Sequence, residues 1–411
     1  MRIDPEDVAL CLVDDDVPAT GAAGSASAYV WRAPDGARPT ATPIVQTSLF
    51  TFPTFQALID GLSAEHRHTV YTRGQNPTVE VLERKLAALE RGEACKCFGS
   101  GMAAINAVMT GLLRSGDHVL FVNNTYGPTI ELAEHLGRFG VEHDLLLDGT
   151  PDAVRAALRP NTSLVWLESP GTMLFRVVDV AGIASVAREH GALTCMDNSW
   201  STPLLQKPLA LGADIVVHSC TKYLAGHSDL VAGAVISTAQ RMEELFYRSF
   251  LLNGGVLAPF DAWLLLRGLR TLPARLRQHE ADALAVARFL DGHPGVRRVH
   301  HPALDSGPEG GAVDAGASNM GALAGTSGLF SFELVRDDFA SVSRVLDTLE
   351  HIHLGVSWGG VESLAISPSR PDNEAELDAK GMPRGLIRLS VGLEGADVLI
   401  ADLDAALATV S

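Results

Sequence analysis

The chain has 411 residues, of which 46% are hydrophobic and 20% charged, a balance typical of globular proteins rather than of disordered or fibrous ones. Its formal net charge of −17 argues against a nucleic-acid partner or an anionic membrane surface, because both attract clustered Lys and Arg. No apolar run is long enough to span a bilayer, nothing resembles a secretory signal, and the five cysteines lie mostly in apolar runs, so a reducing cytoplasm is the predicted location.

The first 77 residues are predicted to form a mobile tail and an extended arm. Residues 1–30 mix acidic residues with a Gly/Ala/Ser stretch, which is typical of a tail. Over residues 40–77, prolines and aromatics interrupt any period. Regular structure is expected to begin at Thr78, where apolar residues recur at helical spacing up to Gly92.

Short β-like runs then alternate with helical runs, and this alternation predicts parallel strands with crossover helices. The predicted strands cover residues 95–98, 118–122, 164–167, 193–196, 215–217 and 231–236, and the predicted helices cover 102–113, 129–139 and 180–189.

The C-terminal third has a different pattern. Residues 240–290 are nearly all helical, and shorter strands (328–334, 386–391) and helices (339–349, 396–409) follow. The glycine-rich segment 304–328 is predicted to be a loop. We therefore expect three parts: a tail and arm at 1–77, a larger α/β domain at 78–270, and a smaller α+β domain at 271–411.

One lysine is placed for covalent chemistry. Lys222 follows an apolar strand in the segment S-C-T-K-Y-L-A-G-H-S-D at 219–229, where desolvation disfavours its ammonium form and favours a nucleophilic amine. Asp197 ends another apolar strand 25 positions earlier. A lysine that forms a Schiff base and an aspartate that holds a pyridinium nitrogen are what a protein contributes to pyridoxal phosphate chemistry. The pair therefore predicts a pyridoxal 5'-phosphate enzyme.

A glycine turn is a candidate phosphate site. In F-G-S-G-M at 98–102, Gly101 and Met102 join a strand to a helix whose first amides have no partner within the helix. The hydroxyls of Ser219 and Thr221 are expected to reach the same anion. A plain chain reversal is an equally good explanation of the turn taken alone. A dinucleotide fingerprint is rejected because the next strand ends in Asn rather than in an acidic residue.

Two further side chains are candidates for substrate chemistry. Tyr126 follows a strand on the same edge, where its ring can stack on a pyridine ring and its hydroxyl can move protons. Arg388 lies within an apolar strand, and a bidentate contact with a substrate carboxylate would satisfy its guanidinium. A buried ion pair is the structural alternative for Arg388, and packing is the alternative for Tyr126.

Other motifs are rejected. The G-x-S-x-G match at 355–359 has no histidine after it, which argues against a serine hydrolase of that type. The histidine and cysteine spacings fit no recognised zinc motif, so no metal site is predicted.

With these residues in view, the chain resembles the pyridoxal-phosphate enzymes of Cys/Met metabolism, the transsulfuration family, from about Ala41 to the end. The resemblance implies the fold-type I (aspartate aminotransferase-like) α/β fold of PLP-dependent transferases. It implies that Lys222 binds the cofactor covalently, that Asp197 pairs with the ring nitrogen and that Tyr126 stacks on the ring. By the same resemblance, the phosphate would be held by Gly101, Met102, Ser219 and Thr221.

The resemblance also implies an assembly. Tyr71 and Arg73, in Y-T-R-G-Q-N-P at 71–77, match an element that in this family reaches the phosphate site of the neighbouring subunit. A homodimer that pairs again into a homotetramer is therefore expected, with a small sulfur amino acid as substrate.

Within the family, the motifs S-W-G-G at 357–360 and E-S-P-G at 168–171 resemble the cystathionine β-lyase branch. This branch implies α,β-elimination of cystathionine to homocysteine, pyruvate and ammonia, with Ser357 and Trp358 beside the substrate. The alternative is a γ-acting member: cystathionine γ-synthase, cystathionine or methionine γ-lyase, or O-acylhomoserine sulfhydrylase. The segment at 71–77 favours that alternative.

Overall fold

The computed structural model describes residues 1–14, 37, 39–304 and 322–410. A seven-stranded sheet forms the centre of the larger domain, in the order β1-β7-β6-β5-β4-β2-β3. The strands are β1 (Ala94–Phe98), β2 (His118–Val122), β3 (Glu142–Leu146), β4 (Thr162–Glu168), β5 (Leu193–Asp197), β6 (Ile215–His218) and β7 (Gly233–Ser237). The five neighbouring strands β3, β2, β4, β5 and β6 pair in parallel, and β7 runs antiparallel to both of its neighbours, β6 and β1.

Helices cover both faces of this sheet, as the predicted crossovers require. One face packs on α4 (Gly101–Leu112), α5 (Gly127–Leu136) and α9 (Ala239–Leu245). The other packs on α6 (Pro151–Ala157), α7 (Val180–His190) and α3 (Pro77–Glu90). Short helical pieces complete the domain: η1 (Gly137–Phe139), α8 (Thr202–Leu205), the π-helical turn η2 (Phe246–Phe250) and α10 (Leu251–Asn253).

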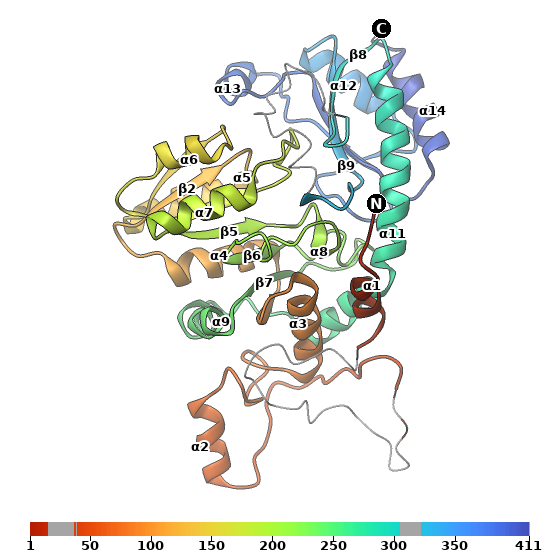
Figure 1. Ribbon diagram of the computed structural model, residues 1–411. Helices are drawn as coiled ribbons and strands as arrows, with labels where there is room; N and C mark the ends of the chain where they lie inside the picture. Colours follow the sequence, from red (N-terminus) through yellow and green to blue (C-terminus); the bar gives the residue numbers. More distant parts are fainter. Residues whose placement is uncertain (15–36, 38, 305–321, 411) are drawn as a thin grey trace.

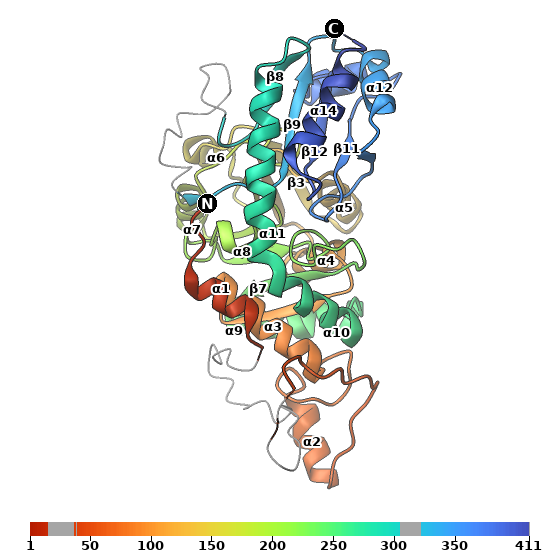
Figure 2. The same cartoon turned by 90° about the vertical axis from the view of Figure 1, so that its right-hand side faces the viewer.

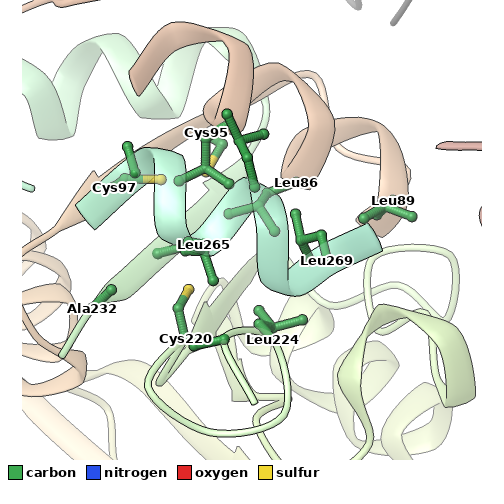
Figure 3. Close-up of a cluster of buried hydrophobic side chains, with 14 of the residues drawn as sticks. Leu86, Leu89, Cys95, Cys97, Cys220, Leu224, Ala232, Leu265 and Leu269 are labelled. Atoms are coloured by element: carbon green, nitrogen blue, oxygen red, sulfur yellow. The ribbon is translucent and has the colours of Figure 1, made fainter. Parts of the chain in front are cut away.

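The helix predicted from Thr78 is confirmed as α3. Asn76 caps its N-terminus by accepting a hydrogen bond from the Thr78 amide, Pro77 occupies the first turn, and Arg91 ends it in a left-handed conformation. Its apolar face packs on β1 and on the long helix α11 (Pro259–Asp291), as Figure 3 shows. Four of the five cysteines, Cys11, Cys95, Cys97 and Cys220, lie in this core, and all five are free and buried.

The smaller domain is built on a five-stranded sheet in the order β10-β11-β12-β9-β8. The strands are β8 (Val296–His300), β9 (Leu329–Leu334), β10 (His353–Leu354), β11 (Leu364–Ile366) and β12 (Leu386–Ser390). The helices α12 (Phe339–Thr348) and α14 (Ala396–Leu407) pack on it, and α13 (Glu374–Ala379) lies at its edge. This is the α+β pattern expected from the sequence.

A single helix links the two domains. The 33-residue α11 (Pro259–Asp291) runs along one side of the molecule from the larger sheet to the smaller one (Figures 1 and 2). Its first half contributes to the same core as α3, and its second half contributes to the core of the smaller domain. The domain boundary predicted at 270/271 therefore falls inside a continuous helix.

The prediction of a mobile tail is wrong for the first residues of the chain. Residues 5–12 form α1 (Pro5–Leu12), which packs on α3 and α11. Asp7 pairs with Lys207 at 2.7 Å, and Asp14 pairs with Lys85 and Arg270, each at 2.6 Å. The sequence alone does not indicate these ion pairs, because the partners lie far away along the chain. The remainder of the predicted tail, residues 15–30, lies outside the described residues.

The predicted arm contains a helix that the sequence analysis missed. The helix α2 (Phe55–Ser63) projects away from the rest of the molecule (Figures 1 and 2). Most of the predicted loop at 304–328 lies outside the described residues, but its end is anchored, since the Gly328 amide donates to the Tyr223 hydroxyl at 2.8 Å. Among the helices of the described part, none is long and apolar enough to cross a membrane.

The ion pairs of Asp14 predict a large stability effect. In Asp14→Ala the ammonium of Lys85, which is fully buried, loses its carboxylate and has no water to replace it. We expect the free energy of unfolding to fall by about 3–5 kcal/mol, measured by urea denaturation. The exposed carboxylate of Asp337 offers a control, and Asp337→Ala should cost less than about 1 kcal/mol. Equal losses in the two variants would contradict this assignment.

Candidate active site

A cavity of about 260 Å³ opens at the carboxyl ends of the parallel strands, where the smaller domain meets the larger sheet. Crevices at this edge of an open α/β sheet are where ligands usually bind. Of the side chains predicted from the sequence, those that line the cavity are Gly101, Met102, Tyr126, Asp197, Ser219, Thr221, Lys222, Trp358 and Arg388. Segments far apart in sequence thus meet in one place.

Lys222 lies in the turn after β6, with its amine in the cavity. Its Nζ donates a hydrogen bond to Ser357 Oγ at 2.7 Å and lies 5.4 Å from the centre of the Trp358 ring. Burial, with the nearby charge of Arg388, lowers the pKa of the Lys222 amine to about 8. A substantial fraction of the amine is therefore neutral near pH 8 and available as a nucleophile or base.

One end of the cavity is suited to an anion. Ser100 caps α4 through its side chain, so the amides of Gly101 and Met102 begin the helix beside Ser219. A Cβ atom at Gly101 would lie 3.0 Å from Ser219 Cβ, which explains why glycine is needed there. Thr221 also lines the cavity, and its hydroxyl donates a hydrogen bond to the Ala232 carbonyl and accepts one from the Ala232 amide. The weakly positive N-terminus of α4 thus faces open space.

Two carboxyl groups lie at the floor of the cavity. Asp197 ends β5, and its Oδ1 accepts a hydrogen bond from the Ser199 amide at 2.9 Å. Burial raises the pKa of the Asp197 carboxyl, and the hydrogen bonds from Ser199 oppose the shift. Glu168 ends the neighbouring strand β4 and also lines the cavity. The sequence analysis noted the segment of Glu168 as a motif but assigned this residue no role.

Tyr126 immediately precedes α5 and lines the cavity next to Glu168 at the end of β4. Its backbone amide donates to Glu168 Oε1 at 2.7 Å. The loop is fixed further by Asn123, whose amide donates to the Glu168 carbonyl at 3.0 Å, and Gly171 leaves the space that this side chain needs. Burial raises the pKa of the Tyr126 phenol, while the charge of Arg388 opposes the shift. The phenol therefore remains protonated at neutral pH.

Arg388 comes from β12 of the smaller domain and points into the cavity. Its Nη2 donates to the carbonyl oxygens of Val356 and Ser357, at 2.8 and 3.3 Å. Burial lowers the pKa of the guanidinium to about 10, so it stays charged at neutral pH. No carboxylate of the described residues forms an ion pair with it, and the structural ion pair considered from the sequence is therefore not found in that part of the chain. This arginine is suited to a bidentate contact with a carboxylate ligand.

Three predicted residues do not line this cavity: Ser357, which contacts Lys222, and Tyr71 and Arg73, which lie away from it. Tyr71 is 44% exposed, and the Arg73 guanidinium lies 5.6 Å from the centre of its ring. Neither lines the cavity of its own chain. Their predicted contact with a neighbouring subunit stays a prediction.

The rejected motifs have other roles. Ser357, the serine of the G-x-S-x-G match, accepts a hydrogen bond from Lys222. Among the described residues, no group of three or more His, Cys, Asp or Glu side chains is arranged to hold a metal ion.

Comparisons with known proteins agree with this geometry. The sequence model of the family described as "Cys/Met metabolism PLP-dependent enzyme" matches residues 31–408. The L-methionine γ-lyase of Pseudomonas putida is 39% identical over 371 residues, which cover 89% of this chain and 92% of that protein. The cystathionine γ-lyase of Bacillus subtilis is 37% identical over 374 residues, which cover 90% of this chain and 94% of that protein.

A solved structure has the same fold. The crystal structure of cystathionine γ-synthase from Xanthomonas oryzae pv. oryzae, in complex with aminoacrylate and cysteine, has a TM-score of 0.83 and 35% sequence identity. The match covers 98% of this chain and 97% of that chain. The fold-type I architecture predicted from the sequence is thereby confirmed.

The environment of Lys222 predicts its reactivity. Reductive labelling of the cofactor-depleted protein with a small aldehyde and borohydride should modify Lys222 with a midpoint near pH 8, because burial lowers its pKa to about 8. Peptide mapping by mass spectrometry measures the labelled fraction at each pH. Lys222→Ala supplies the blank for that peptide. A midpoint near the ordinary lysine value of 10.5 would contradict the assignment.

Proposed function

The chain belongs to the Cys/Met metabolism PLP-dependent enzymes, and from this premise we propose that it is a carbon–sulfur lyase acting at the γ-carbon of a sulfur amino acid. Its cofactor is pyridoxal 5'-phosphate, as for the family. The observation that carries the proposal is the single cavity in which Lys222, Asp197, Tyr126 and Arg388 meet. The γ-acting names of the relatives favour this chemistry over the β-lyase preferred from the sequence.

The residues of the cavity fit the cofactor. We assign its phosphate to the N-terminus of α4 with Ser219 and Thr221, where glycine leaves the helix end open. Asp197 would hold a proton on the ring nitrogen, and Lys222 would provide the covalent attachment. Tyr126 would stack on the ring. When bound, the cofactor stabilises the negative charge that develops at the substrate α-carbon.

The protein groups divide the remaining work. Arg388 binds the substrate carboxylate, because its charged guanidinium faces the cavity. The Lys222 amine, with a pKa of about 8, takes the proton from the α-carbon and then one from the β-carbon. Tyr126, protonated because burial raises its pKa, donates a proton to the departing sulfur. With one water molecule consumed, which supplies the keto oxygen and releases the nitrogen, the products are a thiol, 2-oxobutyrate and ammonia.

A second candidate is α,β-elimination of cystathionine. It is favoured by Trp358, which lies beside Lys222 in the S-W-G-G segment that resembles the β-lyase branch. Glu168 and Pro170 of the E-S-P-G segment line the same cavity. This reaction needs proton removal only at the α-carbon and gives pyruvate rather than 2-oxobutyrate.

We further propose that the active enzyme is a homodimer, paired again into a homotetramer, in which Tyr71 and Arg73 complete the phosphate site of the neighbouring subunit. The proposal is supported by two observations. Both residues are exposed to solvent and do not line the cavity of their own chain, and the arm that contains them projects from the molecule together with α2 (Figure 1). A shared site is incomplete in a single chain.

The keto acid distinguishes the two reactions. Purified protein is supplied separately with methionine and cystathionine, and the keto acids are separated and identified by mass spectrometry. We expect 2-oxobutyrate from both substrates. Lys222→Ala should abolish both the turnover and the visible absorbance of the bound cofactor, whereas the exposed control Lys380→Ala should retain both. Pyruvate without 2-oxobutyrate from cystathionine would reject the γ-acting proposal and support β-elimination.

Hybrid assembly tests the shared site. Lys222→Ala and Arg73→Ala are each expected to be inactive, yet in a mixed dimer one site receives both intact residues. Statistical pairing of equal amounts of co-expressed chains should then restore about a quarter of the wild-type activity, since half of the dimers are mixed and one of their two sites is intact. Activity no greater than that of the two separate variants would contradict the contribution of Arg73 to a neighbouring site.

A further inference from the structure

Two carboxyl groups stand next to each other at the floor of the cavity. Glu168 and Asp197 are paired in register on the parallel strands β4 and β5, and both line the cavity. Neighbouring strands lie roughly 4.8 Å apart, and residues in register point to the same face. Glu168 is only 7% exposed. Two carboxylates this close in a buried site do not both remain ionised.

The surroundings decide which carboxyl carries the charge. Asp197 accepts hydrogen bonds from Ser199, and the charges of Lys222 and His218 favour its ionised form. Among the described residues, no cation contributes to the shift at Glu168: β5 presents Asp197, which is acidic, and the groups that favour the ionised form of Glu168 are the backbone amides of Tyr126 and Thr172. Burial raises the pKa of the Glu168 carboxyl well above its usual range, and the charge of Asp197 raises it further, while the backbone hydrogen bonds from Tyr126 and Thr172 oppose the shift without cancelling it.

Glu168 also holds the loop that carries Tyr126. Its Oε1 accepts the Tyr126 amide at 2.7 Å, and its backbone carbonyl accepts the Asn123 side chain at 3.0 Å. The side-chain contact is to the backbone of Tyr126, so Glu168 acts on the phenol only through the position of the chain. An uncharged acceptor is sufficient for this bond.

We propose that Glu168 is a positioning residue, held as a neutral carboxylic acid, which fixes the backbone of Tyr126 and leaves Asp197 as the single carboxylate facing the cofactor ring. The inference rests on the proposed function, because it uses the roles given above to Asp197 and Tyr126. It adds to that function a second carboxyl whose neutrality is required, since a second negative charge beside Asp197 would compete for the proton of the ring nitrogen.

Two substitutions at position 168 test separately whether the side chain needs a charge and whether it needs a hydrogen-bond acceptor. Glu168→Gln keeps an acceptor oxygen for the Tyr126 amide and is uncharged at every pH, so it imitates the neutral acid. Glu168→Ala removes the acceptor and leaves the amide unpaired. Glu142→Gln, an exposed change at the edge strand β3, is the matched control.

The first readout is kinetic. In the loaded enzyme we expect kcat of Glu168→Gln within about threefold of wild type and kcat of Glu168→Ala lower by at least about tenfold, the order expected when an acid–base group is misplaced. The effect should fall on kcat more than on KM. The control should equal wild type. Equal losses in Glu168→Gln and Glu168→Ala, or no loss in Glu168→Ala, would overturn the inference.

The second readout does not depend on any substrate. The infrared difference spectrum of loaded wild type minus loaded Glu168→Gln at neutral pH should contain the carbonyl stretch of a protonated carboxyl. A carboxylate band in its place would overturn the inference even if the kinetics agreed. Because this spectrum needs no turnover, it decides the state of Glu168 whether or not the protein proves to be a γ-acting lyase.

The pH dependence of stability provides the same information thermodynamically. The pKa of Glu168 is raised in the folded state above the ordinary value of 4.5, so its stabilising effect is complete below that value and is lost as the pH rises towards the folded-state pKa. Over this range the unfolding constant of loaded wild type should rise by up to about tenfold per pH unit relative to Glu168→Gln. Parallel pH profiles would count against a neutral Glu168.

Discussion

Desolvation at the carboxyl ends of the parallel strands is the constraint on which the site depends. It lowers the pKa of Lys222 to about 8 and raises the pKa of Asp197 and of Tyr126. The same loss of water therefore makes Lys222 a base, keeps Tyr126 an acid, and makes the carboxylate of Asp197 strongly favour a cationic partner. Each group would be an ordinary solvated side chain if the sheet edge were open. The smaller domain, by closing this edge, makes the chemistry available.

The closure is a matter of packing rather than of local sequence. Arg388 from β12 lines the cavity, and Ser357 from the loop between β10 and β11 contacts Lys222, because α11 is shared by the cores of both domains. The amine of Lys222 is oriented by Ser357 across that junction. The side chain of Lys222 is flexible, and its amine has to break only the hydrogen bond to Ser357 in order to move. It can therefore reach adjacent carbons of a substrate in turn, as the removal of two successive protons requires. The contact thus orients the base without fixing it.

Much of this arrangement was predictable because it is encoded locally. The helix α3 has a cap, a proline and a helical period, and the turn at Gly101 and the lysine after β6 each have a short, specific pattern. The strand β3 and the helix α6 were missed because their polar residues and partial exposure leave no clear period. The helix α1 was missed because its charges are satisfied by distant partners. The sequence indicates Glu168 only as part of a motif, because its position beside Asp197 depends on the register of β4 with β5.

The helix α1 precedes the segment that the family model matches. The family match begins at residue 31, after both α1, which packs on α3 and α11, and Asp14, which forms buried ion pairs. Asp14 joins Lys85 of α3 to Arg270 of α11, so it connects two helices that pack on the sheet behind Lys222. Such a pair is costly to desolvate but far costlier to break, and it therefore selects one arrangement of these helices over others. In this chain, residues outside the family match thus help to fix the helices that support the lysine turn.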